Sequence, residues 1–84
     1  MSKEIIFPII YDLRIIYRGD SAQGIEHIEK LLKDMSIMYK PGVIKPGGKS
    51  DLVRLAFNVT IMNKQQMDVM YGNLNTIPGI KWAT

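Results

Sequence analysis

The sequence predicts an α+β fold in which two helices cover one face of a four-stranded antiparallel sheet. Apolar and polar residues alternate over 11–18 and 52–62, as in strands with one buried face. Apolar residues recur at helical steps over 25–35 and 67–74. The resulting order is strand, helix, strand, strand, helix, strand, which is the ferredoxin-like βαββαβ arrangement. Right-handed crossovers then place the first and third strands at the centre of the sheet.

The first half of the chain contains a strand over Tyr11–Arg18 and a helix. Gly19 ends the strand, and Asp20 is expected to cap the helix because Gln23 follows at capping-box spacing. The buried side of the strand carries Leu13, Ile15 and Tyr17. The apolar stripe of the helix consists of Ile25, Ile28, Leu32 and Met35. We expect this helix to end before Pro41.

The second half begins with a short strand over Val43–Lys45 and a long strand over Leu52–Met62. Asn63 and Gln66 predict the start of a second helix. Its apolar stripe consists of Met67, Met70, Tyr71 and Leu74, and the six methionines of the chain are expected to fill the core. In the last strand, alternation places Ile80 and Trp82 under the helices. Phe57, in the long strand, is also expected there.

Length and composition limit the possible functions. The chain of 84 residues is one domain, 1–84, and 1–8 are expected to form a loose N-terminal arm. It has no cysteine and one histidine, so no metal site and no cofactor are expected. The net charge of +3 comes without any block of like charge, and no segment resembles a signal peptide or a membrane span. A cytoplasmic location is therefore expected.

The segment Gly42–Ser50 ends in Gly-Lys-Ser, like a phosphate-binding loop. The first glycine of that motif would stand at position 43, where the sequence has Val43. The motif also requires a following helix, whereas Leu52 begins an alternating strand. The segment is therefore predicted to be a hairpin turn that binds no nucleotide.

Two stretches resemble the YbeD-like family of small bacterial proteins. They are "FP" followed by "DLRIIYRG", and "RLAFNVTI" followed by "NKQQMDVMYGNLNTIPGIKW". Gln66, Met70-Tyr71 and Leu74 match the family's pattern, whereas the hairpin "KPGGKSDL" keeps only its glycine. The resemblance implies a ferredoxin-like fold akin to the amino-acid-sensing ACT domains, and a regulatory or interaction module without established activity. It brings no catalytic residues.

The sheet face opposite the helices is the first candidate site. Strand alternation places on it a surface of Arg14, Ile16, Arg54, Asn58 and Lys81. Basic residues beside an exposed isoleucine suit an interface. The principal hypothesis is a non-catalytic binding or regulatory module that associates with a protein partner or with itself.

Two alternatives remain open. An ACT-like sensor would hold a small molecule at the first strand–helix turn, with Arg18, Gly19, Asp20 and Gly24 as the ligand-binding residues. A weak, sequence-independent nucleic-acid binder would use the open face. That face is expected to expose no aromatic ring on which bases stack, so nucleic acid is the less favoured partner.

An enzyme is not expected, and no catalytic residue is assigned. Arg18 and Asn58 could occupy the places of the arginine and asparagine of acylphosphatases, which share this topology. The glycine-rich phosphate cradle of those enzymes is missing, and one histidine without clustered carboxylates supplies little acid–base chemistry.

Overall fold

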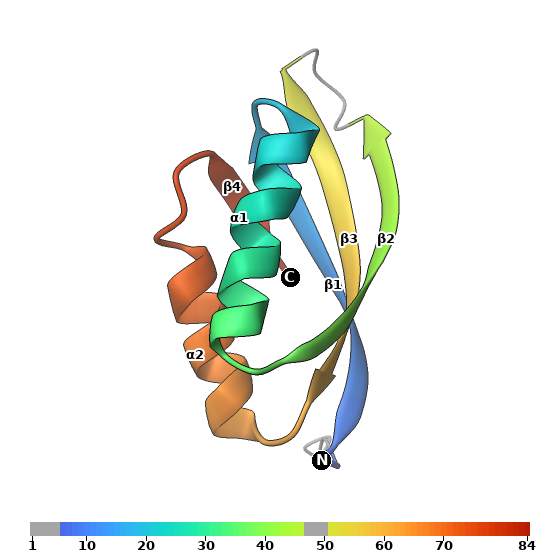
Figure 1. The fold of residues 1–84 in the computed structure, drawn as a ribbon, viewed down its shortest axis with the longest axis vertical. Helices are drawn as coiled ribbons and strands as arrows, with labels where there is room; N and C mark the ends of the chain where they lie inside the picture. The colour runs from blue at the N-terminus through green and yellow to red at the C-terminus, as the bar shows by residue number, and fades with distance from the viewer. Residues whose placement is uncertain (1–5, 47–50) are drawn as a thin grey trace, which may run out of the picture.

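The computed structural model describes residues 6–46 and 51–84, and it confirms the predicted fold class (Figure 1). Two helices lie side by side on one face of an antiparallel sheet with the strand order β2-β3-β1-β4. The elements are β1 (Ile9–Arg18), α1 (Ser21–Asp34), β2 (Met38–Pro46), β3 (Leu52–Ile61), α2 (Lys64–Leu74) and β4 (Ile80–Ala83). The other face of the sheet, which we call the open face, is not covered by any described element.

Both predicted helix caps are confirmed. The Asp20 carboxylate accepts a hydrogen bond of 3.3 Å from the backbone N–H of Gln23. The Asn63 side chain accepts one of 2.8 Å from the N–H of Gln66, whose side chain accepts one of 2.7 Å from the N–H of Met62. These caps satisfy N–H groups that have no partner within the helix, and so they fix where each helix begins.

The core lies between the helices and the sheet. Leu13, Ile15 and Tyr17 of β1 are buried, as are Phe57 and its alternate neighbours in β3. From the helices, the buried side chains are Ile28, Leu32, Met70 and Leu74. The two stripes predicted from the sequence therefore both face the sheet.

β2 is longer than predicted, beginning at Met38 instead of Val43 and passing through Pro41. A proline lacks a backbone donor, but β2 is an edge strand, where one side of the backbone needs no strand partner. The pairing register with β3 shifts between Pro41 and Ile44. Gly42 lies at this irregularity, and a Cβ there would come within 2.8 Å of the Ala56 carbonyl oxygen, so only glycine allows this approach.

The prediction that Trp82 lies under the helices is wrong. Tyr17 pairs with Ile80, but Ile16 pairs with Trp82, so Lys81 is an extra residue in β4. This bulge shifts Trp82 to the side of the sheet that carries Ile16. The indole is 54% exposed, whereas Ile80 still packs against the core.

Two methionines also depart from the prediction. Met70 is buried, but Met38 and Met62 are mostly exposed. At the N-terminus, Ile6 is exposed and Phe7 packs against the core. The rest of the expected arm, 1–5, and the predicted turn over 47–50 lie outside the described residues.

Candidate functional site

A row of four side chains crosses the open face, one from each strand. Trp82 pairs with Ile16, Ile16 with Arg54, and Arg54 with Lys45. Paired residues in adjacent strands project from the same face, so these side chains form a continuous line, which we call the cross-strand row. One half of the row is apolar and the other half is cationic.

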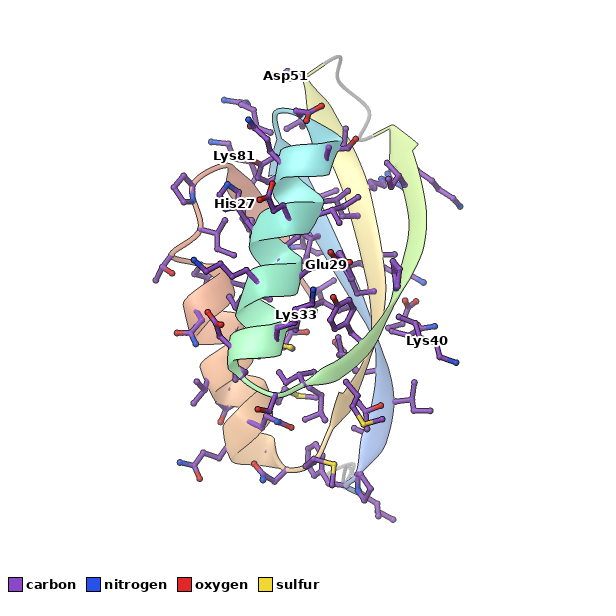
Figure 2. The ribbon with its side chains drawn as sticks, in the orientation of Figure 1. His27, Glu29, Lys33, Lys40, Asp51 and Lys81 are labelled. Atoms are coloured by element: carbon purple, nitrogen blue, oxygen red, sulfur yellow. The ribbon has the colours of Figure 1, made fainter. Side chains whose placement is uncertain are left out.

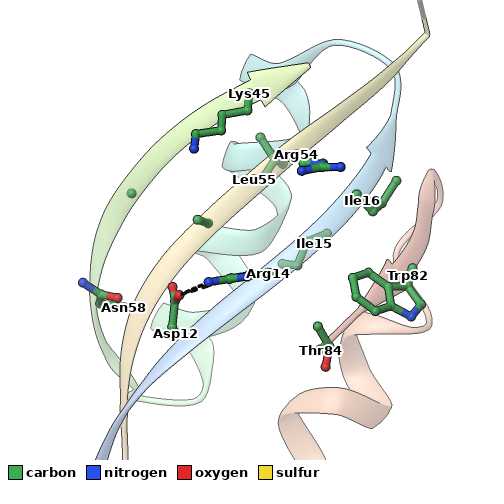
Figure 3. Close-up of a pocket in the computed structure, with 12 residues that line it drawn as sticks. Asp12, Arg14, Ile15, Ile16, Lys45, Arg54, Leu55, Asn58, Trp82 and Thr84 are labelled. Atoms are coloured by element: carbon green, nitrogen blue, oxygen red, sulfur yellow. Dashed lines mark hydrogen bonds and ion pairs between the residues drawn. The ribbon is translucent and has the colours of Figure 1, made fainter. Parts of the chain in front are cut away.

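The cross-strand row borders a hollow of about 640 Å³ in the open face (Figure 3). Arg14 and Thr84 also line it, and Asp12 and Asn58 stand at its opposite end. Gly42 and Ala56 also line it, and neither has a long side chain. The hollow therefore results from small residues on β2 and β3 that are surrounded by long polar ones.

The charge on this face is predominantly positive. Arg14 pairs with Asp12 at 3.1 Å, and both side chains are exposed. Lys40 lies opposite Asn58 in the register of β2 and β3, and its side chain projects away from the helices (Figure 2). Among the described residues, Lys40, Lys45 and Arg54 form no ion pair. Three cations are thus available to an anionic partner.

Four of the five residues predicted for the interaction surface lie together. Arg14, Ile16, Arg54 and Asn58 all line the hollow. Lys81 is exposed but does not line it, because the bulge removes this residue from the alternation.

Trp82 was not predicted to lie on this face, and it occupies the place expected for Lys81. Gly79, which directly precedes β4, is the one local feature of the sequence that indicates an irregular strand. It does not indicate on which face of the sheet Trp82 lies.

The four residues predicted to bind a small molecule have other contacts. Arg18 pairs with Asp51 at 3.0 Å, and the Gly19 N–H donates to the Asp51 carbonyl oxygen at 3.1 Å. Asp20 caps α1. Gly24 is buried, and a Cβ there would lie 2.8 Å from the Tyr17 ring. The space beside this turn is therefore filled by the protein's own tyrosine.

A shallower hollow of about 360 Å³ lies between α1 and the segment after α2. His27, Lys30 and Asp34 line it from α1, and Asn73 and Pro78 line it from the other side. Its charged residues have mixed signs, so it shows no preference for one sign of ligand charge.

Two tyrosines meet at the edge of the core. The Tyr71 hydroxyl donates a 3.0 Å hydrogen bond to the Tyr11 hydroxyl, and the rings pack edge to face. Burial, together with this bond and the charge that Tyr11 would carry when ionised, raises the pKa of Tyr71 well above its ordinary value. Tyr71 therefore keeps its proton near neutral pH.

The described residues contain no group of three or more His, Asp or Glu side chains placed to hold a metal ion. None of the described helices has the length and apolar character to cross a membrane.

Comparison with known proteins supports the fold. The chain is similar to the solution structure of protein HP0495 from H. pylori, with a TM-score of 0.79 and 12% identity over 99% of this chain and 88% of that one. It is also similar to the C-terminal domain of the MgtC protein from Mycobacterium tuberculosis, with a TM-score of 0.72 and 16% identity over 96% and 89%. At such identities the likeness shows the fold alone.

No protein-family model and no curated protein matches the sequence. The resemblance to the YbeD-like family therefore stays a prediction.

Proposed function

We propose that this protein is a non-catalytic binding module of the cytoplasm that associates with a protein partner through the open face of its sheet. The cross-strand row supports this proposal most directly. It combines an exposed tryptophan and a half-buried isoleucine with cations that form no ion pair within the described residues, and tryptophan and arginine are among the residue types that contribute most to protein interfaces. The adjoining hollow gives a partner side chain room to be buried.

The exposed tryptophan also bears on the nucleic-acid alternative. Trp82 gives the open face one ring for stacking, but it stands on an edge strand. The rings of the two central strands, Tyr17 and Phe57, are buried under the helices. RNA-recognition sheets stack bases on aromatics of the central strands, so this arrangement favours a protein partner.

The test compares charge reversal on the two sides of the molecule. The open-face variant is Arg14→Glu, Arg54→Glu, and the matched control is Lys33→Glu, Lys64→Glu on the helices. Both change the net charge by the same amount at exposed positions. Sedimentation measures self-association, and quantitative mass spectrometry of proteins captured from native lysate measures partner recovery.

We expect the open-face variant to lose association that the parent and the control retain. Equal association by all three proteins would refute the proposed function.

A further inference from the structure

We propose that the occupant of the open face is a short acidic segment of another protein, with an apolar side chain against Trp82 and Ile16 and carboxylates against Arg54 and Lys45. This inference rests on the proposed function and specifies the chemistry of the partner. It follows from the order of side chains in the cross-strand row, where two apolar residues are followed by two cations.

The apolar half of the row would hold the anchor of the segment. Trp82 is 54% exposed at the edge of the sheet, and Ile16 beside it is half-buried. Figure 3 shows both side chains on the same side of the hollow. An aliphatic side chain laid between them would remove apolar surface from water on both.

The cationic half would select carboxylates. Lys45 and Arg54 form no ion pair within the described part of the chain. Arg14 lies outside the cross-strand row, opposite Ala56, and forms an ion pair with Asp12. A guanidinium binds a carboxylate through two parallel hydrogen bonds, which would fix the segment's position. Charge complementarity thus calls for two acidic groups on the partner.

The dimensions of the row set the spacing. Strands in a sheet lie about 4.8 Å apart, so the row extends roughly 14 Å from β4 to β2. An extended chain advances about 3.4 Å per residue, and alternate residues point to the same side. A segment with an apolar residue at its first position and acids at its third and fifth would match the row.

A second copy of this chain fits the face less well. It would bring to the interface the same cations, Lys40, Lys45 and Arg54, which form no ion pair within residues 6–46 and 51–84. Its nearby carboxylates, Asp12 and Asp51, already pair with Arg14 and Arg18. Burying cations without anions is unfavourable, so a partner of opposite charge is preferred.

The probe is a blocked synthetic peptide containing Leu-Ser-Glu-Ser-Glu between serine and glycine flanks. Trp82 is the single tryptophan of the chain, so its fluorescence reports binding at the proposed place. A labelled copy of the peptide provides anisotropy as a second readout. Comparison peptides carry Gln for both Glu, Lys for both Glu, or Ser for Leu, and a ten-residue oligouridylate represents nucleic acid.

We expect the acidic peptide to quench or shift Trp82 emission. Replacing both Glu by Gln should weaken binding at least about tenfold, and replacing Leu by Ser should weaken it by several fold. The Lys45→Gln, Arg54→Gln protein should lose about tenfold in affinity. The matched Lys33→Gln, Lys64→Gln protein should bind like the parent, and circular dichroism verifies that each variant is folded.

Binding that is insensitive to the two Glu residues, absence of binding, or tighter binding of the oligouridylate at physiological salt would overturn this inference. If the charge-reversed open face still abolishes association while the peptide results are negative, the proposed function stands and only the acidic segment is refuted. If charge reversal leaves association unchanged, the proposed function itself fails.

Discussion

Three glycines surround the ring of Tyr17. A Cβ would lie 3.3 Å from this ring at Gly19, 2.8 Å at Gly24 and 2.7 Å at Gly79. Gly19 and Gly79 also have positive φ values of 129° and 93°, which disfavour other residues. The glycine that the sequence suggested for ligand binding, Gly24, therefore has a packing role, since it lets the first turn of α1 approach the strand.

Two helical glycines should respond oppositely to alanine. Gly24→Ala should lower the free energy of unfolding by about 1–3 kcal/mol, because the methyl group would overlap the packed Tyr17 ring. Gly72→Ala should raise it by up to about 1 kcal/mol, because no atom lies within 4 Å of the added Cβ and alanine has the higher helix propensity. Urea unfolding measures both, and equal effects would contradict the packing at Gly24.

Tyr71 should make stability depend on pH in the alkaline range. Folding raises the pKa of this hydroxyl above its unfolded value of about 10, so the folded state holds the proton more tightly. The resulting contribution to stability is fully present below about pH 10 and is lost as the pH rises further. Tyr71→Phe should show a smaller loss of stability than the parent between pH 8 and 11 in urea unfolding. An identical loss of stability in the parent and in Tyr71→Phe would contradict Tyr71 as the source of this pH dependence.

At the scale of elements, β4 decides the character of the open face. Its bulge places Trp82 beside Ile16, and without it the tryptophan would point toward the helices. We expect Trp82 emission in the folded protein to resemble that of the unfolded chain. We also expect iodide to quench it more strongly than caesium, because the hollow that it lines carries more cationic than anionic side chains. A blue-shifted emission resistant to both ions would show that the strand has the opposite orientation.

The regular elements could be predicted from sequence because their signals are local. Leu13, Ile15 and Tyr17 alternate over an uninterrupted strand, and Asp20 and Asn63 mark the helix starts with caps. In β3, the alternation of side chains along the strand was enough to place Phe57 in the core and Arg54 on the open face.

The two edge strands, β2 and β4, could not be predicted in the same way. The face taken by Trp82 depends on an extra residue that only the pairing with β1 reveals. The course of β2 through Pro41 depends on its place at the sheet edge, which is a property of the whole sheet. As a result, the sequence predicted the lining residues of the two central strands, namely Arg14 and Ile16 of β1 and Arg54 and Asn58 of β3, but it missed Trp82 of β4 and Lys45 of β2.

At the scale of the whole molecule, the buried core lies between the helices and the sheet, so the side chains of the open face should contribute little to stability. The Arg14→Glu, Arg54→Glu change should alter the free energy of unfolding by less than about 0.5 kcal/mol, because both residues are exposed and the Arg14–Asp12 pair is a surface ion pair. Urea unfolding of this variant and the parent provides the measurement. A loss of several kcal/mol would mean that the open face is needed for folding.

Nucleic-acid binding by the whole molecule should be weak and salt-dependent. Each phosphate neutralised on a single strand contributes about −0.7 to the slope of log K against log salt concentration, so a few cations give little affinity at physiological salt. Filter binding of single-stranded RNA across a salt series measures this slope. Sub-micromolar affinity that persists at physiological salt would favour the nucleic-acid alternative.

The proposed function requires that a protein partner contacts the open face. Site-specific photo-cross-linking in cells that produce the protein tests it directly, with p-benzoylphenylalanine placed at Asn58 on the open face or at Gln65 on α2, both exposed. We expect covalent adducts with another protein from position 58 and few or none from position 65. Adducts from position 65 alone, or none from either position, would contradict binding of a protein at the open face.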